Sequence, residues 1–290
     1  MNAPFLVVLG VAQDAGHPQA GCERSCCRPA WEDPSRAHLV TSLGLVDPRD
    51  GRRWIFDASP DLPRQLRHLD RLAPPKERPP DLAGVFLTHA HIGHYTGLVH
   101  LGREVMGASG VPLYAMPRMR AFIEASGPWE LLVRLGNVSL QTLTDGQGVR
   151  LADDLVVTPF AVPHRGEYSE TVGFRIRGPG REAVYLPDID KWSRWSVPVE
   201  RLLAEVDLAY VDATFYADGE LPGRDMAEIP HPFVQETLAR LADQPAALRA
   251  KVRFIHLNHT NPLLDPDSAA QDVVRSAGMR VAEEGEVFAL

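Results

Sequence analysis

The chain has 290 residues, of which 44% are hydrophobic and 23% are charged, so it is long and apolar enough to bury a sizeable core. Its 38 acidic and 30 basic residues give a formal net charge of −8, and no run of Lys or Arg could neutralise a phosphate backbone, so we expect no nucleic acid partner. No apolar run approaches the roughly 20 residues of a membrane span, and no basic segment precedes the apolar N-terminal stretch. We therefore expect a cytoplasmic protein that does not bind membranes.

Short β-rich runs, separated by turns or helical segments, recur along the chain. Strands are expected at 5–11, 38–47, 52–59, 84–90, 111–116, 138–143, 154–163, 171–178, 181–187, 207–215, 252–258 and 278–290. The helical segments each carry apolar residues three and four positions apart and so bury one face; they are expected at 61–69, 96–106, 117–125, 197–206, 231–241 and 268–278.

This alternation predicts the architecture. Strands interspersed with helices can close as two sheets that helices cover on the outside. The proline-rich stretch at 71–80 is expected to be a surface loop rather than a domain boundary. We therefore predict one domain over residues 1–290 with an α/β fold, arranged as a four-layer αβ/βα sandwich.

Three histidines cluster at the end of the expected strand 84–90, in the sequence VFLTHAHIGHYTGL. Alternate residues of a strand share a face, so His89 and His91 can point at one metal ion. After the chain turns, His94 can reach the same ion or a neighbour about 3.5–4 Å away in a two-metal site. Imidazole suits zinc and also iron or manganese. The alternative is three unrelated, exposed loop histidines, but 3 of the chain's 11 histidines lie within six positions here.

Further candidate ligands lie at the ends of other expected strands: His164, Asp188 and His256. Each alone would be interpreted as structural, but catalytic groups gather on loops at one rim of a sheet, and the histidine cluster favours ligation for all three. Asp188 is the expected bridging ligand, because one carboxylate can bind two cations. His259 is the second choice for the last position. We expect Asp188 and His256 to be catalytic residues as well as metal ligands.

The order of these residues resembles the metallo-β-lactamase superfamily, whose motif H-x-H-x-D-H is followed by a single His, an Asp and a last His. The resemblance implies one metal bound by His89, His91 and His164 with Asp188 nearby, and a second bound by His94, Asp188 and His256. This chain has Gly93 at the position of the motif Asp. We therefore expect the second position to bind metal weakly or to stay empty, unless His259 supplies the missing ligand.

Four further segments resemble pyrroloquinoline quinone biosynthesis protein B and its relatives: LGVAQDAGHPQAGC, FDASPDLPRQL, GRDM and FIHLNHTNPLL. That subgroup has largely lost the H-x-H half of the superfamily motif and lacks an Asp matching Asp188. This chain retains His89, His91 and Asp188. The resemblance therefore implies the scaffold of the quinone-biosynthesis subgroup combined with the metal site of a working hydrolase.

The three cysteines, Cys22, Cys26 and Cys27, lie together in a Gly- and Pro-rich loop. The loop is similar to the C-x-C-x-x-C zinc loop of related phosphodiesterases of phosphonate metabolism, although Arg24 occupies the middle position here. By that resemblance His231 is the candidate fourth ligand of a structural zinc ion. The alternative is free or merely packed thiols, since adjacent cysteines rarely form an unstrained disulfide.

Four more residues are candidates for supporting roles. Asp57 matches the superfamily Asp that orients a ligand imidazole, and the alternative is a turn-capping residue. Asp212 is similarly placed, and we assign it no direct role. Asp14 and His17 lie in the loop expected to border the site, where they either contact substrate or are simply solvated.

Three functional hypotheses follow. In the first, one or two zinc ions (or iron or manganese) activate water to hydrolyse an ester, phosphodiester or amide. In the second, an iron-loaded site hydroxylates a peptide or small molecule in a quinone-type pathway. In the third, the altered site sequesters a metal or cofactor without catalysis. The expected partner is a small-molecule or peptide substrate, and the sequence leaves the oligomeric state, including a homodimer, open.

Overall fold

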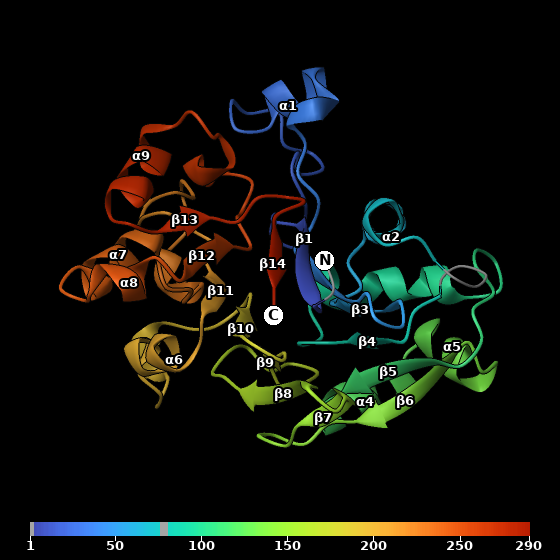
Figure 1. The fold of residues 1–290 in the computed structure, drawn as a ribbon. Coiled ribbons are helices and arrows are strands. Elements are labelled where there is room, and N and C mark those ends of the chain that lie inside the picture. The colour runs from blue at the N-terminus through green and yellow to red at the C-terminus, as the bar shows by residue number, and fades with distance from the viewer. Residues whose placement is uncertain (1–2, 76–80) are drawn as a thin grey trace.

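The computed structural model describes residues 3–75 and 81–290, so residues 76–80 of the expected proline-rich loop lie outside the described part. Two seven-stranded sheets form the centre of this part (Figure 1). The first sheet has the order β14 (Val287–Ala289), β1 (Phe5–Gly10), β2 (Ser42–Asp47), β3 (Arg52–Phe56), β4 (Gly84–Phe86), β5 (Val111–Ala115) and β6 (Val138–Thr142). The second has the order β13 (Arg280–Val281), β12 (Val252–Ile255), β11 (Leu208–Asp212), β10 (Glu182–Leu186), β9 (Val172–Arg177), β8 (Leu155–Ala161) and β7 (Val149–Ala152).

Helices cover the outer faces of both sheets (Figure 1). Against the first sheet lie α2 (Leu62–Leu72), α4 (Pro117–Ala125) and α5 (Trp129–Arg134), and against the second lie α6 (Val199–Glu205), α7 (Val234–Leu241), α8 (Ala246–Arg249) and α9 (Ala269–Ser276). The short helices α1 (Arg28–Glu32) and α3 (Ile92–Tyr95) belong to the loops after β1 and β4. This is the predicted four-layer αβ/βα sandwich.

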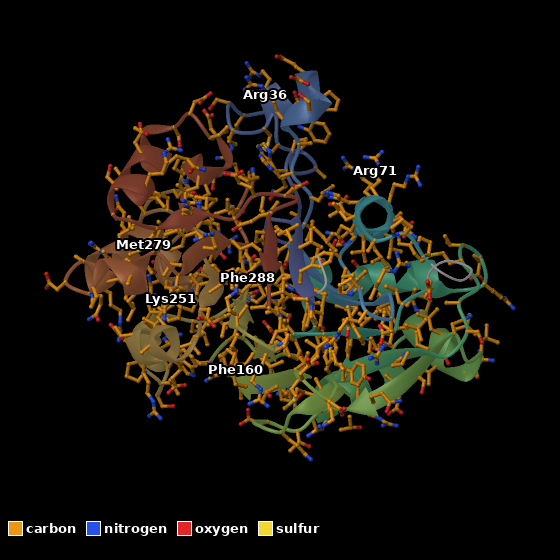
Figure 2. The ribbon with its side chains drawn as sticks, in the orientation of Figure 1. Arg36, Arg71, Phe160, Lys251, Met279 and Phe288 are labelled. Atoms are coloured by element: carbon orange, nitrogen blue, oxygen red, sulfur yellow. The ribbon has the colours of Figure 1, made fainter. Side chains whose placement is uncertain are left out.

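The alternation of side chains along β1 shows why the layers form. All six residues of this strand are buried, because the strand is covered on both faces. Leu6 and Val8 contact the core between the two sheets, whereas Val7 and Leu9 contact the core beneath α2. Side chains fill the interior between the sheets (Figure 2). Phe56 and Phe86 belong to this core, and the centroids of their stacked rings are 5.1 Å apart.

Two helical predictions need correction. The helix expected at 96–106 is only a 3-10 turn, Thr96–Leu101, because this segment passes close to the chain after β3. A Cβ on Gly97 would lie 1.9 Å from the carbonyl oxygen of Ser59, so the close approach requires glycine here. The helix expected to start at His231 starts at Val234. The segments α1, α3, α5, α8 and β7 were not predicted. The stretch expected as a strand at 278–290 is two strands, β13 and β14, which belong to different sheets.

The sheet topology brings distant parts of the chain to one edge of the sandwich. Strands β3 and β4 run parallel, as do β10, β11 and β12, so within each group the carboxyl ends lie together. Asp57 and His256, directly after β3 and β12, have φ angles of 64° and 67°. Non-glycine residues adopt this conformation rarely, and such strain clusters at functional sites. In the described residues, no helix has the length and apolar character to cross a membrane.

Candidate metal centre

Histidines and aspartates that follow strands of both sheets meet at this edge. Two of the groups of potential ligands that they form are these: His89, His91, His164 and Asp188, and Asp14, His94 and His256. A third, Asp188, Asp212 and His231, shares Asp188 with the first and is described below. Each residue of the first two groups except Asp14 was predicted as a metal ligand, the three clustered histidines from their spacing and the others from their positions at strand ends. Most are buried, and His94 is fully so. The geometry of each group decides what it can bind.

The first group has the spacing of a tetrahedral site. His89 Nε2 lies 2.8 Å from His91 Nδ1 and 3.2 Å from Asp188 Oδ2. His164 Nε2 lies 3.4 Å from both His91 Nδ1 and Asp188 Oδ1. Ligand atoms about 2.0–2.1 Å from a tetrahedral zinc ion are about 3.3–3.4 Å apart. Three of the four distances match this spacing, and His91 Nδ1 would have to move slightly away from His89 Nε2 to admit a zinc-sized ion.

The second group is built around His94. Its Nε2 lies 3.0 Å from Asp14 Oδ1, and His256 Nε2 lies 3.5 Å from the same oxygen. Asp188 Oδ2 is 3.9 Å from both imidazole nitrogens. Asp188 therefore faces both groups, which is the position expected of a bridging carboxylate.

Two buried atoms of the centre lack a hydrogen-bond partner among the described residues: His94 Nε2 and Asp188 Oδ1. An unpaired buried polar atom is costly, so such atoms are rare in folded proteins. Asp14 Oδ1 is close to His94 Nε2, yet the two atoms do not align as donor and acceptor. A cation in the group of Asp14 and His256 would satisfy His94 Nε2, and a cation beside His164 would satisfy Asp188 Oδ1.

The charges of the centre also fit cations. Burial alone would raise the pKa of Asp188, but the neighbouring His164, His256 and His231 outweigh it and hold that pKa well below its usual range. Interactions with His256 and His94 likewise lower the pKa of Asp14 against the effect of burial. Burial and the nearby His94 lower the pKa of His89, so this imidazole is neutral. Ionised carboxylates and neutral imidazoles are the forms that bind metals. Burial alone would lower the pKa of His94, but Asp57 and Asp14 outweigh it and raise that pKa well above its usual value, so a metal ion at His94 Nε2 would displace a proton.

The imidazoles are oriented by hydrogen bonds to their other ring nitrogens. Asp57 Oδ2 lies 2.8 Å from His94 Nδ1, as its resemblance to the superfamily Asp implied. The hydroxyls of Thr88 and Thr214 lie 3.0 Å from His89 Nδ1 and 2.9 Å from His256 Nδ1. Asp190 Oδ1, 3.3 Å from His164 Nδ1, plays the same part. Such contacts fix the ligating nitrogen, and of these four residues the sequence pointed only to Asp57.

His231 and His259 each lie in the cluster that was predicted for the other. His231 was expected at the cysteines, but its Nδ1 lies 2.7 Å from Asp212 Oδ2 and 3.2 Å from Asp188 Oδ1, inside the metal centre. Burial alone would lower the pKa of His231, but the charges of Asp212 and Asp188 outweigh it and raise that pKa to about 9. Asp212, to which the sequence gave no role, is therefore the partner that orients this imidazole.

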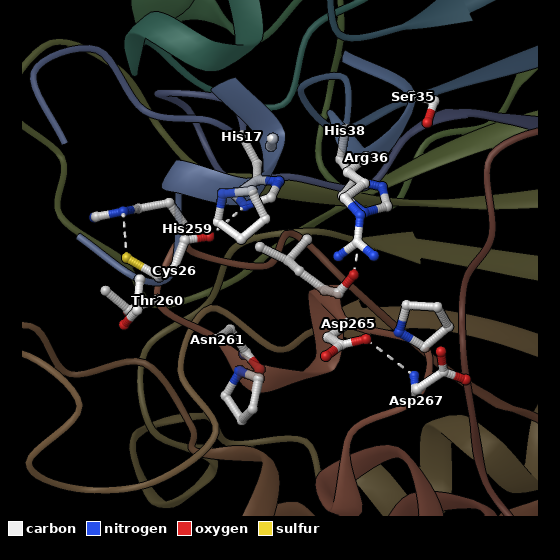
Figure 3. A pocket seen from close by; sticks show the side chains of 16 residues that line it. His17, Cys26, Ser35, Arg36, His38, His259, Thr260, Asn261, Asp265 and Asp267 are labelled. Carbon is white, nitrogen blue, oxygen red and sulfur yellow. Dashed lines mark hydrogen bonds between the residues drawn. The ribbon is translucent and has the colours of Figure 1, made fainter. Parts of the chain in front are cut away.

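His259 was expected as an alternative ligand of the centre, but it joins the cysteines instead. Its Nδ1 lies 3.2 Å from Cys27 Sγ and 3.7 Å from Cys26 Sγ, and Cys22 Sγ lies 3.6 Å from Cys26 Sγ. Thiolate and imidazole ligands of a tetrahedral zinc ion are about 3.5–3.8 Å apart. The four side chains thus fit a closed structural site. They adjoin a cavity of about 470 Å³, whose wall includes His17, Cys26 and His259 (Figure 3).

The comparisons with known proteins agree with this geometry. A model of the beta-lactamase superfamily domain matches residues 52–257. The chain belongs to the metallo-β-lactamase superfamily. Coenzyme PQQ synthesis protein B of Gluconacetobacter diazotrophicus is 30% identical, over 97% of each chain. Zn²⁺-bound PqqB from Methylobacterium extorquens is 26% identical and covers 99% of this chain and 100% of its own, with a TM-score of 0.83. A diphosphatase of the PhnP family, 22% identical over 99% and 97% of the two chains (TM-score 0.68), shares the fold.

Within the superfamily the chain is PqqB-like, and its metal centre opens into a positively charged cavity. This cavity, of about 460 Å³, is lined by His231, by three exposed arginines (Arg24, Arg165 and Arg224) and by one acidic residue, Glu228. Arg165 Nη2 lies 3.5 Å from His91 Nε2, so this guanidinium stands beside a potential metal ligand, where it also pairs with Glu167 at 3.5 Å. In a chain with a formal net charge of −8, three arginines around one cavity indicate a local preference for anions.

Proposed function

We propose that this protein is a metal-dependent hydrolase that binds two divalent ions and cleaves an ester bearing a negative charge. The observation that carries the proposal is the place of Asp188, whose carboxylate faces both ligand groups at 3.2–3.9 Å. Bound there, a pair of metal ions would supply an activated water and would stabilise the charge that develops during hydrolysis.

The residues around the centre would bind the substrate and donate a proton to the leaving group. His231 lines the arginine cavity, and its Nδ1 is engaged by Asp212, so its Nε2 is left for a bound substrate. This arrangement suits a proton donor to the leaving group. Arg165, whose guanidinium lies beside His91, and Arg224 both line the cavity, and they would pair with an anionic group of the substrate. An exposed cleft with a neutral lining would suit a neutral ester or amide equally well, whereas this one favours a phosphodiester or carboxylate-bearing ester.

The test is a substrate panel with zinc-, manganese- and iron-loaded protein. It should contain phosphodiesters, carboxylate-bearing esters, and neutral esters and amides with the same leaving group. We expect turnover of the anionic members, and we expect Arg165→Ala with Arg224→Ala to raise KM for these by about tenfold or more without changing metal content. Absence of turnover on every member would contradict the proposal. Equal loss on neutral esters in the arginine variant would contradict the assigned substrate class.

A second candidate, an iron-dependent hydroxylase in quinone cofactor synthesis, is favoured by a different observation. Asp14, His94 and His256 form a set of two histidines and one carboxylate, a set that binds iron in oxygenases. The name of the relatives, coenzyme PQQ synthesis protein B, supports a pathway of this kind. Oxygen uptake by anaerobically iron-loaded protein, with a peptide or amino-acid-derived substrate, separates this candidate from hydrolysis. Hydrolytic turnover by the zinc form, with no oxygen uptake by the iron form, would exclude it.

A further inference from the structure

Gly93 stands where the superfamily motif has its aspartate, and the space beside it is already taken. A Cβ built on Gly93 would lie 2.3 Å from Asp14 Oδ1, 2.6 Å from Asp14 Cα and 2.9 Å from Asp14 Cγ. Real Cβ atoms essentially never approach other atoms below 3.0 Å. Any side chain at position 93 and the present position of Asp14 therefore exclude each other.

The backbone fixes Asp14 in this space. Gln13 N donates to the carbonyl of Leu257 at 2.7 Å, and Leu257 N donates to the carbonyl of Val11 at 2.8 Å. These bonds join the loop after β1 to the segment directly after His256. Asp14 and His256, 242 positions apart in the sequence, are thus held on adjoining backbone segments. The position of the carboxylate is a property of the fold rather than of a free side chain.

Asp14 completes the second ligand group. Its Oδ1 lies 3.0 Å from His94 Nε2 and 3.5 Å from His256 Nε2, and Asp188 Oδ2 lies 3.9 Å from both nitrogens. Four ligand atoms of a tetrahedral zinc-sized ion are about 3.3–3.4 Å apart. Without Asp14, only His94, His256 and the shared Asp188 would serve this position.

We propose that Asp14 is the carboxylate ligand of the second metal position, and that it replaces the motif aspartate from a different loop. Asp14 and Gly93 act as an exchanged pair. Asp14 supplies the carboxylate, and Gly93, which has no side chain, leaves the space that Asp14 occupies. The inference rests on the metal centre of the proposed function but not on the reaction. It predicts a second position that binds metal tightly, against the weak or empty position expected from the sequence.

Four variants of the full chain test the exchange: Asp14→Asn, Asp14→Gly, Gly93→Asp, and the double variant Asp14→Gly with Gly93→Asp. Each metal-free protein is titrated with Co²⁺ against a competing chelator, and thermal unfolding is followed in parallel. Absorption from cobalt–thiolate bonds marks the ion at the cysteines, so the two ions of the centre are counted separately. Glu23→Gln, which removes an exposed carboxylate from the same N-terminal loop, is the matched control.

We expect Asp14→Asn and Asp14→Gly to weaken binding of the second ion by about 100-fold or more, because loss even of a group that only orients a ligand costs about 10–100-fold. Gly93→Asp alone should also weaken it, because the new side chain meets Asp14 at 2.3 Å. The double variant should return to within about tenfold of wild type, since the carboxylate is back at the motif position. Glu23→Gln should bind like wild type.

Two results would overturn the proposal: wild-type affinity for the second ion in Asp14→Asn, or a double variant that melts like wild type but binds no better than Asp14→Gly. Asp14→Asn keeps the shape of the side chain, so it reports on the carboxylate even if the glycine variant folds poorly. A protein that binds two ions as described but hydrolyses nothing would leave this inference intact and contradict only the proposed function.

Discussion

The strand-end centre and the cysteine cluster are both suited to metals, but they are built in opposite ways. The centre draws its ligands from the ends of strands in both sheets, and it opens into a cavity lined by arginines. The cysteine cluster draws three ligands from one loop and one from His259, and its four side chains close on one another. Closed sites with four protein ligands are typical of structural zinc, whereas catalytic sites keep a position open.

The cysteine cluster lies on the same chain segments as two ligands of the strand-end centre. The loop that carries Asp14 continues directly into the cysteines, and His259 lies three residues after His256. The cysteine cluster therefore ties together the two segments that bring Asp14 and His256 to the centre. We infer that one cluster performs chemistry and the other positions two of its ligands, and the following predictions test that division from the largest expected effect to the smallest.

The double change His89→Ala with His91→Ala should abolish the activity. It removes two of the four ligands of the first position, so we expect near-complete loss of that ion and a fall in kcat of about 10³-fold or more, roughly 4 kcal/mol of transition-state stabilisation. Elemental analysis and turnover on the best substrate measure the effect. His68→Ala with His100→Ala, two half-buried histidines outside the centre, should change neither. Wild-type metal content in the first variant would refute the assignment of these ligands.

Cys27→Ser should act on stability rather than on chemistry. Cys27 is fully buried, with its sulfur 3.2 Å from His259 Nδ1. Loss of a structural ion removes free energy that binding contributes to folding, so we expect a loss of about 3 kcal/mol and a fall in Tm of at least about 5 °C. Calorimetry of the metal-loaded protein gives both values, with the exposed Ser25→Ala as the control. Unchanged Tm and zinc content would show that the thiols are free.

Asp212→Asn should have the smallest effect of the three, a fall in kcat of about 10–100-fold with both ions of the centre retained. Asp212 acts through His231, whose Nδ1 lies 2.7 Å away, and its charge helps to raise the pKa of that imidazole to about 9. An acid loses activity as the pH rises through its pKa. Removing the charge lowers the pKa of His231, so the alkaline limb of the pH–rate profile should move to lower pH. A fall in kcat with an unmoved profile would indicate a purely structural role for Asp212.

The sequence predicted the layers and most of the centre because both depend on local patterns. Strand periodicity identified the buried strands, and the carboxyl ends of those strands located His89, His164, Asp188 and His256. The partners of His231 and His259 depend instead on how loops turn. At His256 the backbone has a φ of 67°, which reverses the chain so that His259 leaves the centre and meets the cysteines. No residue pattern in a single sequence specifies such a turn.

Asp14 illustrates the same limit. Gly93 signalled that a carboxylate was missing, and Asp14 was placed in a loop that borders the site. Its role follows only from the pairing of the segment after β1 with the segment after β12, a contact between residues more than 240 positions apart. A departure from a motif therefore identifies the place to examine, and the tertiary structure identifies the replacement.

The bridge at Ala12 has a kinetic consequence. Ala12 pairs with Val40 on one side and with Leu257 on the other, so the two sheets are joined by hydrogen bonds at the edge that carries the centre. An ion bound by both Asp14 and His256 would join the same two segments that the bonds between Val11, Gln13 and Leu257 already hold together. Local opening of this edge would then have to release the ion as well as break those bonds, so bound metal should slow hydrogen exchange of the Gln13 and Leu257 amides.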